Sequence, residues 1–509
     1  MGISSYKKVR GYRSRLRVVA AMLWRSREVH AQRAERFKKQ VAELFEQNQQ
    51  QEALLLLANR ETDQLRAQIR NLQAKVQTLE EQPSRLPADP VLPCHHYGPK
   101  MIALSINLAQ NGGLRSAESA LQLVHDTYGI VGKVPHWTTI RTWMQRVGVA
   151  AMDLPLEAAD DWVWMADHSC QVGSEKVLVV LAVRASKMPP PGTALKHEDL
   201  HVLIVQPGTQ WKTEDVAKAY EKLAQKYGVP MALVVDGAPE LRDAAEVLQK
   251  QRPEMLVLND FKHQAANILK ATVGKDEQFT KFSSLVGSTR NAVQQTELAH
   301  LRPPSSRPKS RFMNLAAILH WAALILWLLD HPEAKGREGI SDERLTEKLG
   351  WVREFSEEIA IWNECQDVVS AGVTFMNEQG LFDGATAALR ASMGETSSSM
   401  ATDVKQRLLE FTQASEKLLN EGQRLPISTE ILESSFGLYK QLERQHSRGG
   451  FTSLLAAFGS LLRPVTPQTV RRDLARTSVK QMRAWVSNNL GATLTSKRQT
   501  AYKEFANAA

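Results

Sequence analysis

Two apolar stretches that each end in aspartate decide the fold: residues 162–169 read Trp-Val-Trp-Met-Ala-Asp-His-Ser, and residues 233–239 read Leu-Val-Val-Asp-Gly-Ala-Pro. Both are rich in β-branched and aromatic residues, which predicts strands at 162–172 and 231–235. The flanking sequence predicts further strands at 176–185, 200–206 and 255–258, and helices at 213–227, 240–250 and 261–269. The order β-β-β-α-β-α-β-α predicts a mixed sheet, in which parallel strands joined by helical crossovers extend an antiparallel meander.

The two aspartates are candidate metal ligands. In this topology the first and fourth strands are neighbours, so Asp167 and Asp236 project from adjacent strand ends. Magnesium prefers hard oxygen ligands, and two ions about 4 Å apart need a carboxylate that can bridge them. A lone strand-end Asp before Gly is usually a turn residue, which is the alternative interpretation. The pair favours a site for two Mg²⁺ ions, with Mn²⁺ expected to substitute.

A third carboxylate is predicted on a later helix. The helix expected at 428–442 offers Glu430 and Glu433, which are one turn apart, and Glu433 shares a face with Lys440 two turns further on. We predict Glu433 as the third ligand and Lys440 as a cation that holds a DNA phosphate beside the metals. The alternative is an ordinary surface pair on a helix.

These residues resemble a known family. Asp167, Asp236 and Glu433, with the spacing Glu433-x6-Lys440, resemble the catalytic triad of DDE transposases from bacterial insertion sequences, which are built on an RNase H-like core. Residues 260–263, Asp-Phe-Lys-His, are similar to the [C/D]-x-x-H motif of hAT and Mutator-like elements. The predicted helical segment 273–427 resembles the insertion domain that such enzymes place before the Glu.

The resemblance implies metal-dependent cleavage at transposon ends and strand transfer into target DNA, with Asp167, Asp236 and Glu433 binding two Mg²⁺. It also implies that His263 supports the reaction near the scissile phosphate; the alternative for His263 is an ordinary helix histidine packed on the sheet. The Arg that stands four positions before the Glu in one large insertion-sequence family is replaced here by Thr429.

The positive charge is concentrated at the N-terminus. The chain carries a net charge of +9, whereas residues 1–40 alone hold twelve Lys and Arg against Glu28 and Glu35. Such a block favours a nucleic-acid partner, although a solubilising helix face and an organelle transit peptide are alternatives. The predicted phosphate-binding residues of this arm are Lys7, Lys8, Arg10 and Arg13.

Residues 41–79 hold one heptad register, with Asn48 at an a position, which predicts a coiled-coil dimer. The alternative is one long helix packed on its own protein. Prolines between residues 83 and 99 predict a linker.

Three short helical patterns within 100–150 predict a helix-turn-helix that binds DNA, although a small helical bundle would look the same. In the third helix, Thr139, Arg141 and Gln145 are predicted to face the DNA groove. The core side of that helix is predicted to consist of Ile140, Trp143 and Val147.

The sequence thus predicts a multidomain α + α/β protein, with an RNase H-like mixed β-sheet core that an α-helical insertion domain interrupts. Widely spaced cysteines favour a reducing compartment, and the shortness of the apolar runs favours no membrane partner. The resemblance implies a cytoplasmic, nucleoid-associated location in a bacterium. Two other functions stay open: an RNase H-like junction or repair nuclease, and a domesticated non-catalytic DNA-binding protein that dimerises through the coiled coil. The predicted parts are a basic arm (1–40), coiled coil (41–82), linker (83–99), helix-turn-helix (100–150), first core part (160–272), insertion domain (273–427), catalytic Glu helix (428–445) and basic helical tail (446–509).

Overall fold

The computed structural model divides the chain into two units, residues 1–88 and 89–509. The residues that it describes are 23–24, 26–31, 34–35, 38–39, 55, 62–74, 89–129, 133–172, 175–305, 312, 315–331, 341–444, 451–490, 498–502 and 504–505. In the first unit residues 62–74 are helical, and Leu65, Ile69 and Leu72 of the predicted coiled-coil seam are exposed. The arm residues Lys7, Lys8, Arg10 and Arg13 lie outside the described residues, as does most of the heptad segment.

The second unit contains the predicted five-stranded sheet, with the strand order β3-β2-β1-β4-β5. β1 runs antiparallel to β2 and parallel to β4; β2 is antiparallel to β3, and β4 is parallel to β5. The predicted order and the neighbouring first and fourth strands are therefore confirmed. The elements of this part are β1 (Trp162–Val172), β2 (Glu175–Arg184), β3 (His201–Gly208), α6 (Thr213–Tyr227), β4 (Ala232–Val235), α7 (Pro239–Gln249), β5 (Leu256–Asn259) and α8 (Phe261–Ala271).

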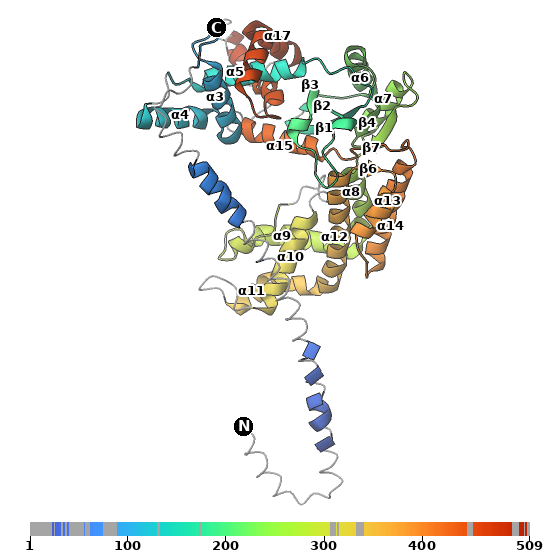
Figure 1. The fold of residues 1–509 in the computed structure, drawn as a ribbon. Coiled ribbons are helices and arrows are strands. Elements are labelled where there is room, and N and C mark those ends of the chain that lie inside the picture. The colour runs from blue at the N-terminus through green and yellow to red at the C-terminus, as the bar shows by residue number, and fades with distance from the viewer. Residues whose placement is uncertain are drawn as a thin grey trace, which may run out of the picture. The chain divides into compact units, whose positions relative to one another are not determined.

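The two faces of the sheet pack against different helices (Figure 1). Trp162, Trp164 and Ala166 of β1 belong to one core, together with apolar side chains of α6 and α7. The alternate residues of the same strand, Val163 and Met165, belong to a second core that includes α8 and α15 (Glu430–Arg444). Since side chains alternate between faces along a strand, the parity of each position tells which helices its side chain meets.

The segment between α8 and α15 is helical, as predicted. In Figure 1 most of its helices lie below the sheet, and α12 and α14 contact α8. Ring contacts of Phe279 and Phe282 with Trp362 join α9 to α12. Its elements are α9 (Glu277–Val293), α10 (Leu315–Asp330), α11 (Asp342–Leu349), α12 (Ser356–Gln379), β6 (Leu381–Phe382), α13 (Ala385–Ser392), α14 (Ser399–Glu416) and β7 (Arg424–Leu425).

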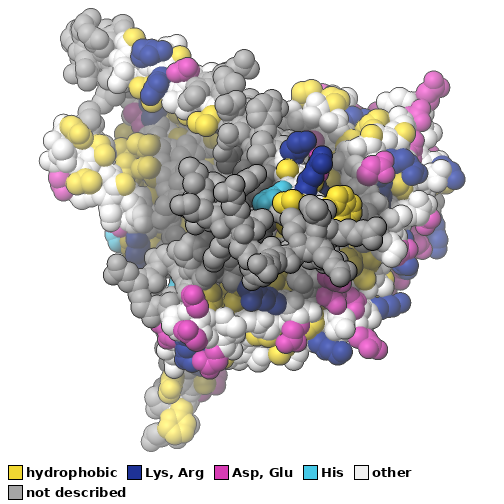
Figure 2. Space-filling model, turned by 90° about the horizontal axis from the view of Figure 1, so that it is seen from below, with side chains coloured by type: hydrophobic (Ala, Val, Ile, Leu, Met, Phe, Trp, Pro, Cys, Tyr) yellow, Lys and Arg dark blue, Asp and Glu magenta, His cyan; other side chains and the backbone are white. Residues whose placement is uncertain are grey.

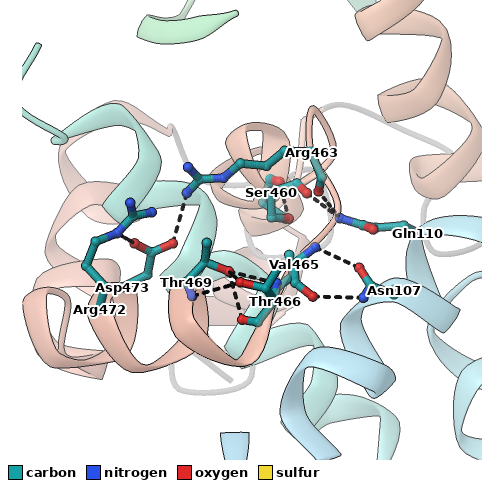
Figure 3. A network of polar contacts seen from close by, with 10 residues as sticks. Asn107, Gln110, Ser460, Arg463, Val465, Thr466, Thr469, Arg472 and Asp473 are labelled. Carbon is teal, nitrogen blue, oxygen red and sulfur yellow. Dashed lines mark hydrogen bonds and ion pairs between the residues drawn. The ribbon is translucent and has the colours of Figure 1, made fainter. Parts of the chain in front are cut away.

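The C-terminal segment packs on the helices that precede the sheet. These are α3 (Pro99–Gly112), α4 (Leu114–Tyr128) and α5 (Trp137–Met152), against which η8 (Ser453–Ser460), α16 (Pro467–Arg476) and α17 (Val479–Asn489) lie. Figure 3 shows how α3 is held: the Asn107 amide exchanges two 2.8 Å hydrogen bonds with the backbone of Val465, and Gln110 donates to the carbonyls of Ser460 and Arg463. Residues 453–489 of the predicted tail thus contribute three elements to this bundle. Within the predicted linker, the Asp89 carboxylate accepts hydrogen bonds from the backbone N–H groups of Lys100 and Met101 at the start of α3.

This packing corrects the prediction for Gln145. The core positions Ile140, Trp143 and Val147 are buried as predicted, but Gln145 is only 3% exposed and donates hydrogen bonds to Ser453 of η8. A side chain in that position does not face a DNA groove.

The other two predicted groove residues, Thr139 and Arg141, are half-buried, and the Arg141 guanidinium lies 5.5 Å from the Trp137 ring centroid. Their contact with DNA, and the helix-turn-helix itself, stay predictions. Among the helices that the structure describes, none has the length and hydropathy needed to cross a membrane.

Gly148 allows α5 to approach η8 at backbone contact. A Cβ atom at Gly148 would lie 2.1 Å from the carbonyl oxygen of Ala456, and one at Gly459 would lie 2.8 Å from the carbonyl oxygen of Gly148. Both contacts are far below van der Waals distance and involve backbone, which a side-chain rotation cannot relieve.

Gly148→Ala is therefore expected to lower the free energy of unfolding by about 2–3 kcal/mol, because the two backbones must separate. The matched control is Gly287→Ala in α9, where nothing lies within 4 Å of the added Cβ. There the better helix propensity of Ala should stabilise the protein by roughly 0.5–1 kcal/mol. Urea unfolding of both variants tests this contrast; equal effects at the two glycines would contradict the backbone contact.

Candidate active site

Asp167 and Asp236 lie where the parallel pairing of β1 with β4 ends, at the carboxyl edge of the parallel part of the sheet. The last parallel pair of the two strands is Ala166 with Val235, so the aspartates are the next residues on each, Asp167 within β1 and Asp236 just after β4. By the parity of their strands, both belong to the face on which α15 packs. Asp167 is 2% exposed. This is the juxtaposition that the sequence predicts.

Asp260 adds a third carboxylate at the same edge. It directly follows β5, its backbone N–H donates to the carbonyl of Val235 at 2.7 Å, and its side chain is 1% exposed. The carboxylate caps α8 through the backbone N–H of Lys262 and accepts a 2.6 Å hydrogen bond from the Thr429 hydroxyl. Asp260 belongs to the motif at residues 260–263, and its position directly after the fifth strand is the sequence signal that places it beside Asp167 and Asp236.

His263 supplies a positive charge to this cluster. Its Nδ1 lies 2.5 Å from Asp260 Oδ2. Burial lowers the pKa of His263, but the hydrogen bond and charge of Asp260, together with the charges of Asp167 and Asp236, outweigh burial and raise its pKa to about 9. Near neutral pH the ring is therefore an imidazolium that interacts with both strand-end carboxylates. Burial raises the pKa of the Asp236 carboxyl.

The raised pKa of His263 predicts how stability depends on pH. A group whose folded pKa exceeds its unfolded value contributes stability that is fully present below about pH 6.5 and is lost as pH rises through about 9. His263→Gln should therefore cost at most about 3 kcal/mol near pH 6, and this cost should shrink as the pH approaches 9.5. Urea unfolding of the wild type and the variant across this range provides the measurement. A difference that does not change between pH 6 and 9.5 would show that His263 is not charged in the native protein.

Glu430 and Glu433 occupy the first turn of α15, beside the start of α8. Lys262 Nζ lies 2.9 Å from Glu430 Oε1 and 2.8 Å from Glu433 Oε2. The second oxygen of Glu430 accepts a hydrogen bond from the Asn377 amide of α12. Burial lowers the pKa of Lys262, but Glu433 and Glu430 outweigh it and raise the pKa above its usual value. Lys262 was not among the predicted site residues, because its partners lie on a helix far away in the sequence.

Lys440 lies on α15 two turns beyond Glu433 and is half-buried. Its role as a phosphate contact stays a prediction.

The arrangement meets the requirements of a magnesium site in part. Asp167 and Asp236 are placed as a ligand pair, and α15 packs against β1, which brings its first turn to the same side. Within the described part of the chain, however, no three side chains among His, Cys, Asp and Glu form a group able to hold a metal ion. Glu433 is instead paired with an ammonium group. The three predicted ligands do not form a metal-binding set in this arrangement.

Comparisons with known proteins leave the family of this chain open. No protein-family model matches it, and no curated protein sequence matches it. A solved structure titled "Drosophila P element transposase strand transfer complex" is similar at 12% sequence identity with a TM-score of 0.36, over 83% of this chain and 100% of that one.

Proposed function

We propose that this protein is a DNA transposase of the DDE type, with an RNase H-like core that cleaves DNA at transposon ends and joins the ends to target DNA. The observation that supports this most is the placement of Asp167 and Asp236 where the parallel pairing of β1 with β4 ends. Asp167 lies within β1 and Asp236 directly follows β4, and by the alternation of side chains both belong to the sheet face that packs against α15, where Glu433 lies.

In this proposal Asp167, Asp236 and Glu433 hold two Mg²⁺ ions, which Mn²⁺ can replace. Bound divalent ions supply Lewis acidity for the activation of water and for the stabilisation of a leaving oxygen. Two further side chains act at the same edge of the sheet, one through its charge and one through a hydrogen bond. His263 holds a positive charge beside the strand-end carboxylates, and Thr429 ties the start of α15 to Asp260.

DNA binding is assigned mainly to the N-terminal arm. On the face in Figure 2, Lys and Arg side chains are interspersed with Asp and Glu side chains over the described surface. Such a mixed surface attracts a polyanion weakly, whereas the arm gathers twelve Lys and Arg within forty residues. In this proposal Lys7, Lys8, Arg10 and Arg13 contact phosphates, Thr139 and Arg141 contribute from α5, and the heptad segment joins two copies.

The test uses the full-length protein and duplex DNA that carries the sequences flanking its gene. With Mg²⁺ or Mn²⁺, we expect nicks at short inverted repeats and joining of the new 3′ ends to a second duplex, both resolved on a sequencing gel. Cleavage without joining would favour a junction or repair nuclease. Binding of DNA with no cleavage in either metal would favour a non-catalytic DNA-binding protein and would overturn the proposal.

A further inference from the structure

The cation between Glu430 and Glu433 is supplied by the same short run that supplies His263. Within residues 260–263, the carboxylate of Asp260 pairs with His263, while Lys262 reaches across to α15. One turn of α8 therefore provides both positive charges of the cluster. The charge of His263 lies near Asp167 and Asp236, and the charge of Lys262 pairs with Glu430 and Glu433.

The ammonium group of Lys262 bridges the two glutamates and is largely shielded from solvent. Its side chain is 19% exposed, and its ammonium contacts one oxygen of each glutamate within 3 Å. Charge-assisted hydrogen bonds of this length are stronger than neutral ones, and partial burial reduces their screening by solvent. Glu433 is thus held by an internal cation at the position where the proposed function requires a metal ligand.

Lys262 also lines a polar pocket of about 380 Å³ between α8, α12 and α15. Ser370, Thr374 and Asn377 contribute oxygen atoms to its wall. These groups offer acceptors to an ammonium that has left Glu433, so release of the glutamate does not require Lys262 to lose all its partners.

We propose that Lys262 is a positioning residue that holds Glu433 in a metal-free arrangement and competes with divalent cations for its carboxylate. The inference rests on the proposed function, since it concerns the third ligand of that site. It explains why Asp167 and Asp236 are placed as a pair while the described residues contain no group of three ligands that could hold a metal ion. A divalent ion at Glu433 would replace the Lys262 ammonium, which would then turn toward the pocket.

The expected consequence is tighter metal binding when the competing charge is removed. Lys262→Met should lower the dissociation constant for Mn²⁺ by roughly tenfold or more, because hydrogen bonds to charged groups are worth that much in binding. Lys262→Arg keeps the charge and should bind Mn²⁺ within about threefold of the wild type. Lys270→Met, which removes an exposed lysine from the same helix, is the matched control and should have no effect.

The experiment titrates the full-length, DNA-free protein with Mn²⁺ and follows free Mn²⁺ by electron paramagnetic resonance. Tighter binding by Lys262→Met and by Lys262→Gln, with Lys262→Arg and Lys270→Met at wild-type affinity, supports the inference. Unchanged or weaker binding by both neutral variants, with circular dichroism showing that at least one is folded, overturns it. If the wild-type protein binds Mn²⁺ no more tightly than Asp167→Asn, the proposed function itself is overturned. This outcome differs from the one that overturns only the role of Lys262.

Discussion

Asp167→Asn is expected to abolish metal-dependent DNA cleavage while the protein stays folded and continues to bind DNA. Asparagine has the same shape, so its buried surroundings within β1 accommodate it with little strain. The exchange removes the negative charge that a divalent ion needs at this position. The cleavage rate should fall at least about a thousandfold, which corresponds to several kcal/mol of lost transition-state stabilisation.

Asp236→Asn should have the same effect, because it changes the partner carboxylate on the neighbouring strand. Glu246→Gln is the control: it removes a carboxylate from the exposed side of α7, on the other face of the sheet. Cleavage rates in Mg²⁺ and Mn²⁺, together with gel-shift measurements of DNA binding, distinguish the outcomes. Cleavage by Asp167→Asn at the wild-type rate would show that this edge of the sheet is not the active site.

The sheet and its two strand-end aspartates could be predicted because local patterns and topology agree there. The strands are apolar runs of β-branched and aromatic residues bounded by turns, and the element order leaves few ways to arrange them. Once β1 and β4 are known to be neighbours, the residues that immediately follow their apolar runs can be predicted to lie together, whatever the conformation of the loops. The strand bounds differ from the prediction by only one or two residues, for example Glu175–Arg184 for β2.

Contacts between distant segments could not be predicted in the same way. Gln145 lies among the polar positions of its helix, so helical periodicity alone assigned it to a solvent-facing surface. Its amide is instead satisfied by Ser453, which is 308 residues away in the sequence. A pattern shows which face of a helix is apolar, but it does not show which other element covers the polar positions. The same limit applies to Lys262, whose partners lie on α15.

The two glutamates of α15 differ in what holds them. Glu430 is bound through both oxygens, by Lys262 of α8 and by Asn377 of α12, so it ties two other helices to the start of α15. Glu433 contacts Lys262 and shares a helix face with Lys440. These contacts predict opposite consequences for otherwise equivalent substitutions: a structural role for Glu430 and a chemical role for Glu433.

Glu433→Gln is accordingly expected to lower the cleavage rate at least about a thousandfold, because a neutral amide would be a poor replacement for a carboxylate that holds a divalent ion. Its free energy of unfolding should change by less than about 1 kcal/mol, since the glutamine oxygen still accepts a hydrogen bond from Lys262, which keeps Glu430 as its charged partner. Glu430→Gln should reduce cleavage less than about tenfold, yet destabilise the protein by roughly 1–2 kcal/mol through weakened charged hydrogen bonds. Cleavage rates in Mg²⁺ and Mn²⁺ and urea unfolding, measured on both variants, separate the two roles. An active Glu433→Gln protein beside an inactive Glu430→Gln protein would reverse the assignment and make Glu430 the third carboxylate.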